Sequence, residues 1–166
     1  VNPALAKAAG HKDAPQAVQH LLAAFLLDLL GVHLHDFHAA IIADAAVNGA
    51  VRFALAEAGR AGRLILKDKT KPQAASGYIV LAMGKMGAFE LNYSSDIDLI
   101  VLYDPAAPAL PADAEPSTLY VRLTQRLVKL LQERTADGYV FRTDLRLRPD
   151  PASTAVAISK AAALSY

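Results

Sequence analysis

The sequence predicts an α/β (α+β) fold in which a small mixed β-sheet is packed by helices and preceded by helices. Apolar residues at helical spacing occupy the first third of the chain, and two short β-branched apolar runs follow them. A further helical stretch separates these runs from a segment that alternates with period two. The chain has 166 residues, of which 54% are hydrophobic, so it can form one domain with a substantial core.

The N-terminal part is predicted to be helical after a flexible end. Residues 1–14 are rich in alanine and show no apolar period. A second helix is expected after Asp36 and ends at Gly59. We therefore expect a helical lead-in over 15–59, within a single domain that runs from 15 to 166. The first helix of this lead-in is predicted by six residues at helical spacing: Val18, Leu21, Leu22, Phe25, Leu26 and Leu29.

The predicted sheet core occupies residues 77–151. A loop rich in glycine and lysine precedes it and contains a short candidate strand at 64–66. The run "YIVLAMG" at 78–84 and the run "DIDLIVLYD" at 96–104 each predict a buried strand.

A helix and a third strand follow a proline-rich connection at 105–117. Ser117 is the predicted N-cap of this helix. Asp137 and Gly138 form a turn signal, and the segment 139–149 alternates with period two and predicts the strand. The inner stripe of the helix is predicted to consist of leucines: Leu119, Leu123, Leu127, Leu130 and Leu131.

The overall composition limits the partners of the chain. The formal net charge is only +1, so no global attraction to nucleic acid is expected. The longest apolar stretch, at 21–32, is interrupted by Asp28 and is too short to cross a bilayer, so no membrane association is expected. There is no cysteine, which excludes disulfides and is compatible with a reducing cytoplasm. Because the chain starts at Val1, and Ser159 has the pattern of a helix N-cap close to the end, we expect a fragment of a longer protein.

Charged side chains gather on one face of two predicted strands. Asp96 and Asp98 are two residues apart, so their side chains leave the same face of their strand. The same period places Asp144 of the third strand together with three arginines: Arg142, Arg146 and Arg148. If the two strands are neighbours, their charged faces combine into one site.

This combination of charges predicts phosphoryl or nucleotidyl transfer. Three carboxylates close together need a counter-charge, and their hard oxygen atoms suit Mg²⁺. Two metal ions can stabilise the attacking and the leaving oxygen of an in-line displacement, and arginine binds phosphate oxygens bidentately. Either strand alone also has a plainer interpretation, as a solvated strand end or as a structural ion pair.

Gly84 closes the first predicted strand and provides a turn at which backbone N–H groups can face an anion. The segment is not a P-loop, because no glycine lies five residues before Gly84 and Met86 replaces the hydroxyl residue after Lys85. Ser95, next to the first aspartate, is a further candidate donor.

Two segments carry a resemblance to a known family. "GKMGAFELNYSSDIDLI" resembles the signature of the DNA polymerase β-like nucleotidyltransferases, in the G-x11-D-x-D form of bacterial glutamine synthetase adenylyltransferase/adenylyl-removing enzymes. "DGYVFRTDLRLRPDP" resembles the third-carboxylate strand of that family. The resemblance extends over 40–166, is most specific over 77–151, and implies a nucleotidyltransferase fold.

The resemblance also implies which residues would act. Asp96, Asp98 and Asp144 would be the catalytic carboxylates and the ligands of two Mg²⁺ ions. The implied contacts to nucleotide and phosphate are Gly84, Lys85, Ser95, Arg146 and Arg148.

Family enzymes carry two such domains, one that adds AMP to a tyrosine of glutamine synthetase and one that removes it by phosphorolysis. The amino-acid sequences of both segments are more similar to the N-terminal, adenylyl-removing copy. We therefore expect an enzyme domain that acts on adenylylated glutamine synthetase in the bacterial cytoplasm, with phosphate and ATP or ADP as substrates or products. The PII signalling protein would be a partner through the full-length enzyme.

Several alternatives stay open at this point. The domain could work in the adenylylating direction, or it could be a PII uridylyltransferase-like domain. From a different class, "HLHDFH" at 33–38 resembles part of a zinc hydrolase motif, although its aspartate is one position early. A regulatory module that has the fold without the chemistry is the last alternative.

Overall fold

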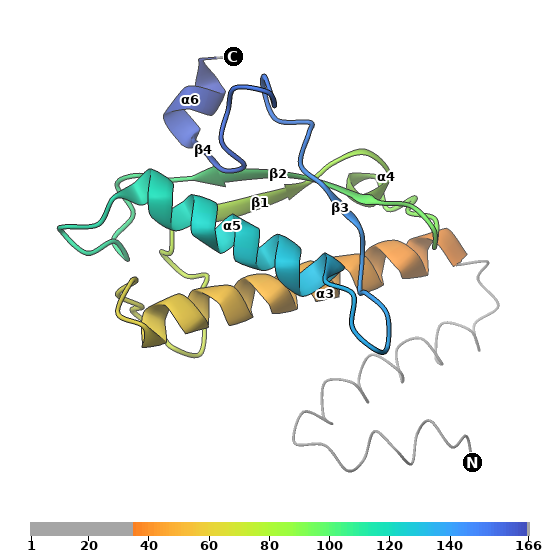
Figure 1. The fold of residues 1–166 in the computed structure, drawn as a ribbon, viewed down its shortest axis with the longest axis horizontal. Coiled ribbons are helices and arrows are strands. Elements are labelled where there is room, and N and C mark those ends of the chain that lie inside the picture. Colours follow the sequence, from red (N-terminus) through yellow and green to blue (C-terminus); the bar gives the residue numbers. More distant parts are fainter. Residues whose placement is uncertain (1–34, 166) are drawn as a thin grey trace, which may run out of the picture.

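A computed structural model of the chain describes residues 35–165 (Figure 1). The predicted flexible end at 1–14 and the first predicted helix lie outside the described residues. Eight elements follow in chain order: α3 (His35–Arg60), β1 (Tyr78–Ala82), α4 (Gly84–Gly87), β2 (Ile97–Tyr103), α5 (Pro116–Gln132), β3 (Thr143–Asp144), β4 (Ile158–Ser159) and α6 (Lys160–Leu164).

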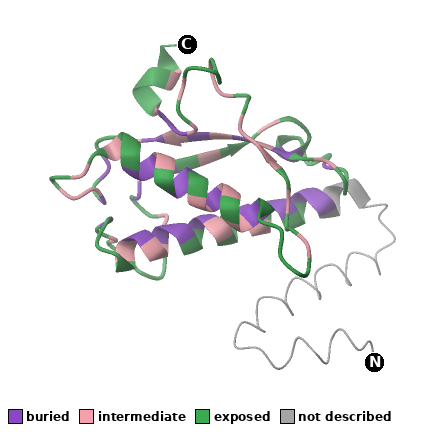
Figure 2. Cartoon of the chain, in the orientation of Figure 1, coloured by how far each residue is buried: buried purple, intermediate pink, exposed green. Residues whose placement is uncertain are grey.

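The described residues form two layers. The long helices α3 and α5 lie together under one face of the sheet, whereas α6 lies on the other side (Figure 1). Buried residues line the sides of these two helices that face each other and the sheet (Figure 2). The predicted α/β fold, with a small mixed sheet packed by helices, is therefore confirmed.

Strand β2 is the centre of the sheet. It pairs antiparallel with β1 along its length, and parallel with β3 near its start and with β4 near its end. Its burial alternates along the strand. Because side chains of a strand alternate between faces, Asp98 points away from the helical layer. The residues of β2 that enter the core are Ile97, Leu99, Val101 and Tyr103.

Helix α3 agrees with the predicted second helix, although it runs one residue beyond Gly59 to Arg60. The segment Ala39–Arg60 is long and apolar enough to cross a membrane by length and composition alone. One side of α3 is buried in the core, where it packs against α5, so this packing accounts for its apolar character.

Three local predictions were wrong. The segment 139–149 contributes only the two-residue strand β3. Residues 64–66 form no strand; Leu64 is buried, and the N–H of Ile65 donates to the carbonyl of Ala109 at 2.8 Å.

Ser117 is not the N-cap of α5. Glu115 caps the helix instead, because its carboxylate accepts the N–H of Thr118 at 2.6 Å and the hydroxyl of Ser117 at 2.8 Å. Pro116 then occupies the first helical turn, where a missing N–H costs nothing.

The predicted N-cap Ser159 is confirmed, since its hydroxyl accepts the N–H of Ala162 at 3.1 Å. Strand β4, which no sequence pattern predicted, ends at this cap residue. Lys160 forms an ion pair of 2.6 Å with Asp104, and this contact ties α6 to the end of β2.

Candidate functional site

The register between β2 and β3 brings two aspartates side by side. Asp98 lies directly opposite Asp144, and Ile97 lies opposite Thr143. Directly opposite residues of neighbouring strands project to the same face of the sheet. Asp98 and Asp144 therefore share the face that lies away from α3 and α5, as the period-two pattern predicted.

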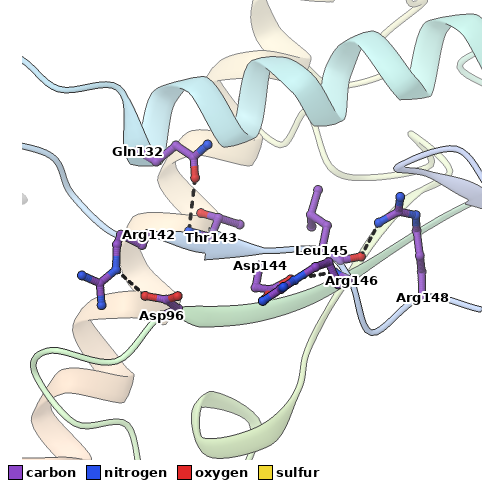
Figure 3. Close-up of polar contacts among 8 residues, drawn as sticks. All are labelled: Asp96, Gln132, Arg142, Thr143, Asp144, Leu145, Arg146 and Arg148. Atoms are coloured by element: carbon purple, nitrogen blue, oxygen red, sulfur yellow. Dashed lines mark hydrogen bonds and ion pairs between the residues drawn. The ribbon is translucent and has the colours of Figure 1, made fainter. Parts of the chain in front are cut away.

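Asp96 precedes β2 by one residue and forms an ion pair with Arg142 (Figure 3). The Nε atom of Arg142 donates to Oδ1 of Asp96, and the Nη2 atom donates to the carbonyl of Ser94 at 2.6 Å. Hydrogen bonding to Asp96 raises the pKa of the Arg142 guanidinium above its ordinary value. We call Asp96, Asp98 and Asp144 the carboxylate face.

Arg146 pairs with the third aspartate. Its Nε atom lies 3.0 Å and 2.9 Å from the two carboxylate oxygens of Asp144, and its backbone N–H donates to Oδ1 at 2.7 Å. These hydrogen bonds lower the pKa of Asp144 below its ordinary value. The pKa of Arg146 is raised, first by Asp144 and more weakly by the charges of Asp96 and Asp98. Arg146 thus lies within the field of all three carboxylates.

The side chain of Arg148 does not pair with a carboxylate of the carboxylate face but binds backbone carbonyls. Its guanidinium donates to the backbone carbonyl of Leu145 at 2.6 Å (Figure 3). It also donates to the carbonyls of Pro151 at 2.8 Å and Thr154 at 3.3 Å. Its charge still contributes to the lowered pKa of Asp144. Of the three predicted arginines, Arg142 and Arg146 therefore lie at the carboxylate face. Arg148 instead stabilises the loop that follows β3.

Gly84 lies two residues after the end of β1, beside Asp98 of the carboxylate face. It has a positive φ of 53°, and a Cβ atom added there would lie 3.0 Å from Oδ2 of Asp98. The N–H of Met83 donates to the carbonyl of Asp98 at 2.9 Å, so the turn is tied to β2. Glycine leaves space beside Asp98 that any other residue would fill.

Lys85 and Ser95 lie in the segments that flank this turn. Lys85 follows Gly84 in α4 and its carbonyl accepts the N–H of Glu90 at 2.8 Å. Ser95 is half-buried in the connection before β2, where its N–H donates to the carbonyl of Asn92 at 3.0 Å. Their roles as nucleotide contacts stay predictions.

The donor set fits a hard divalent cation. Carboxylate oxygens are the ligands that Mg²⁺ prefers, and Gly84 leaves room beside Asp98. In their present positions no three Asp, Glu or His side chains of the described part of the chain converge as a metal-binding group. Instead, Arg142 and Arg146 supply the positive charge that neighbouring carboxylates require.

Arg142 makes more contacts at the site than its place in the sequence indicates. The alternation places it on the charged face, but nothing in the sequence shows that it would contact both Asp96 and the backbone at Ser94. Its position two residues before Asp144 is the signal that pointed to it.

The segment at 33–38, which suggested a zinc hydrolase, lies partly outside the described residues. Its remaining side chains, at 35–38, are also outside what the structure describes.

Comparison with known proteins gives consistent matches. The sequence model of the glutamate-ammonia ligase adenylyltransferase family matches residues 15–166. The chain is 61% identical over 125 residues to a bifunctional glutamine synthetase adenylyltransferase/adenylyl-removing enzyme of Bradyrhizobium sp. (strain ORS 278). It is 58% and 57% identical over 125 residues to proteins of the same name from Xanthobacter autotrophicus and Brucella suis biovar 1. Each alignment covers 75% of this chain and 13% of the relative, so the chain spans a small part of the length of these relatives.

Proposed function

The chain belongs to the glutamate-ammonia ligase adenylyltransferase family, whose members are nucleotidyltransferases, and on this basis we propose that its carboxylate face transfers an adenylyl group. The observation that carries the proposal is the register of β2 and β3, which places Asp98 beside Asp144 and opposite the space left by Gly84. A structural ion pair would need neither the paired aspartates nor the glycine.

Asp96, Asp98 and Asp144 are the proposed ligands of Mg²⁺, with two ions expected. When bound, Mg²⁺ would supply positive charge to the attacking and leaving oxygens of a phosphoryl displacement. The chain's own residues complete this environment. Arg146, whose side chain is 81% exposed, can turn from Asp144 toward a phosphate oxygen. Gly84, Lys85 and Ser95 are the proposed contacts to the nucleotide.

The reaction that we favour is removal of AMP from adenylylated glutamine synthetase. An oxygen of inorganic phosphate forms a bond to the phosphorus of the AMP group, and the bond from this phosphorus to the tyrosine oxygen breaks. The tyrosine oxygen takes up a proton, and the products are ADP and unmodified glutamine synthetase. Both the adenylyltransferase and the adenylyl-removing activity appear in the names of the relatives.

Two features favour removal over addition. The amino-acid sequences of the segments that carry the three aspartates are more similar to the adenylyl-removing copy of the family. In addition, an incoming phosphate dianion must approach an anionic phosphodiester, so positive charge is needed on the attacking side. Arg142 and Arg146 provide such charge beside the carboxylates. Through the full-length enzyme, the PII signalling protein is a proposed regulator of this site.

The substitution Asp98→Asn tests the proposed site in the full-length enzyme. It keeps the size of the side chain but removes one negative charge from the carboxylate face. Removal of a residue that only orients a metal ligand typically lowers metal affinity or activity by about 10- to 100-fold. We therefore expect removal of the ligand charge itself to lower turnover by more than about a hundredfold. The measurement is release of ADP from adenylylated glutamine synthetase in the presence of Mg²⁺ and phosphate.

The control is Asp113→Asn, which changes an exposed aspartate in the connection before α5 and should leave turnover unchanged. Turnover by Asp98→Asn at a rate near that of the wild type would show that the site is wrongly assigned.

A paired assay decides the direction. Asp96 and Asp98 are both changed to Asn in the full-length enzyme, and both AMP addition from ATP and phosphate-dependent ADP release are measured. We expect ADP release to be lost while AMP addition is retained. The reverse result would make this the adenylylating domain, and loss of uridylyl transfer to PII instead would favour the uridylyltransferase alternative.

A further inference from the structure

We infer that Arg142 is a positioning residue that orients Asp96 for binding a divalent cation, an inference that rests on the proposed role of Asp96 as a metal ligand. Arg142 makes contacts on both sides of Asp96 in the sequence. Its guanidinium donates to Oδ1 of Asp96 and to the carbonyl of Ser94 at 2.6 Å. Its own carbonyl accepts the N–H of Ile97 at 2.9 Å. One residue therefore binds the backbone and the side chain of the turn that leads into β2.

The ion pair between Arg142 and Asp96 uses one oxygen of the carboxylate. Hydrogen bonding occupies Oδ1, whereas Oδ2 of Asp96 accepts no hydrogen bond from the described residues. A carboxylate can accept at both oxygens simultaneously. Arg142 can thus stay in place while Oδ2 binds a cation, and the contact with Ser94 limits rotation of the guanidinium.

Arg146 differs from Arg142 in this respect. Its guanidinium contacts both oxygens of Asp144, at 3.0 Å and 2.9 Å from Nε. A cation that binds Asp144 would have to displace Arg146 at least partly. The side chain of Arg146 is 81% exposed and that of Arg142 is 55% exposed, so Arg146 has the greater freedom to move. The two arginines therefore have different roles, with Arg142 as a support and Arg146 as a displaceable counter-charge.

A purely stabilising role does not account for these contacts of Arg142. Exposed ion pairs contribute little to folding stability, because solvent screens the charges and two long side chains lose freedom. Groups that orient a metal ligand, in contrast, typically change metal affinity by about 10- to 100-fold when they are removed.

Binding of Mn²⁺ as a probe for the cation site tests the inference without any measurement of turnover. The affinity is measured by electron paramagnetic resonance titration of the chain and of the full-length enzyme. We expect Arg142→Gln to weaken Mn²⁺ binding by about 10- to 100-fold while thermal unfolding stays near that of the wild type. Arg122→Gln removes an exposed guanidinium of α5 and is the matched control, with an expected change of less than about twofold.

Arg142→Lys separates position from charge. Lysine keeps the positive charge but lacks the planar fork that contacts Asp96 and Ser94 together, so we expect intermediate Mn²⁺ affinity. Affinity of Arg142→Lys equal to that of the wild type would overturn the inference, because charge alone would then suffice. This variant also serves if Arg142→Gln fails to fold.

Asp96→Asn distinguishes failure of the inference from failure of the proposed function. If Asp96→Asn weakens Mn²⁺ binding and Arg142→Gln does not, the inference about Arg142 is wrong and the proposed metal site stands. If Asp96→Asn also leaves the affinity unchanged, Asp96 is not a ligand, and both the proposed role and the inference fall.

Discussion

Gly84 is the residue that controls the space beside Asp98. Its φ of 53° lies in the left-handed region, and a Cβ atom would lie 3.0 Å from Oδ2 of Asp98. Gly84→Ala would therefore both strain the backbone and crowd a proposed metal ligand. We expect a loss of about 1 to 2 kcal/mol in the free energy of unfolding. Because misplacement of a reacting group by about 1 Å can cost about a hundredfold in rate, we expect turnover to fall by about 10- to 100-fold.

The chain contains a matched control for this substitution. Gly62 also has a positive φ, of 70°, but nothing lies within 4 Å of the position that its Cβ would take. Gly62→Ala should show the same loss in the free energy of unfolding, measured by denaturant titration, with turnover unchanged. An equal fall in turnover for both variants would mean that strain, and not crowding of Asp98, is responsible.

At the level of single residues, the period-two rule predicted the candidate site well. It placed Asp98 and Asp144 on one face, and the register of the strands agrees. The rule could not predict the direction taken by Arg148, because local backbone carbonyls compete for a guanidinium and the loop that presents them has no periodic pattern.

At the level of the elements, the alternating segment 139–149 shows why a strand pattern can overestimate a strand. Before β3, the N–H groups of Val140 and Phe141 both donate to the carbonyl of Leu131 at 2.9 Å, so this part is tied to the end of α5. After β3, the N–H of Arg146 donates to the side chain of Asp144 and turns the chain away. Backbone hydrogen bonds to Leu131 before β3 and a hydrogen bond to the side chain of Asp144 after it thus limit the ladder to two residues.

The C-terminal ends of α3 and α4 show another limit of sequence patterns. Both end with the same pair of backbone hydrogen bonds, in which the residue after the C-cap has a positive φ. In α3 this residue is Gly62, as the pattern favours, but in α4 it is Phe89, with φ of 60°. Phe89 is 51% exposed, so burial of its ring does not compensate for the strain, and nothing in the sequence indicates that α4 ends there.

The N-cap of α5 leads to a prediction about pH. Hydrogen bonds, first from the N–H of Thr118 and then from Ser117, lower the pKa of Glu115 from 4.5 to about 2. A carboxylate whose pKa is lower in the folded state stabilises the fold above its unfolded pKa and loses this effect as the pH falls through the folded pKa. We expect Glu115→Ala to lower the melting temperature at pH 7, and this difference from the wild type should shrink as the pH falls from about 4.5 to about 2.

Asp113→Ala is the control for this experiment, because Asp113 is exposed, lies two residues earlier and does not cap the helix. A difference between Glu115→Ala and the wild type that stays constant down to pH 2 would contradict the charged cap as its cause.

For the whole molecule, the sequence predicted the layers because the apolar periods of α3, α5 and β2 each mark one buried face. It did not predict β4, because a two-residue parallel strand depends on tertiary pairing with the end of β2 and leaves no period. It also gave no indication of the aromatic stack that joins the layers. In this stack the ring of Tyr120 on α5 lies 4.8 Å from that of Tyr103 and 6.0 Å from that of Tyr78.

The hydroxyl of Tyr120 links the helical layer to the turn before β1, and its removal should weaken the whole fold. It donates to the carbonyl of Ser76 at 2.6 Å, and both residues are fully buried. Burial raises the pKa of Tyr120 to about 12, so the hydroxyl keeps its proton at neutral pH. Tyr120→Phe leaves the Ser76 carbonyl without this donor in a place that water cannot readily reach. We therefore expect a loss of about 1 to 3 kcal/mol in the free energy of unfolding, measured by denaturant titration.

Tyr103→Phe is the matched control for this prediction. The ring of Tyr103 belongs to the same stack, while its hydroxyl makes no hydrogen bond with the described residues, so the free energy of unfolding should change little. Equal losses in the two variants would contradict the hydrogen bond to Ser76 as the cause, because both variants keep the rings of the stack.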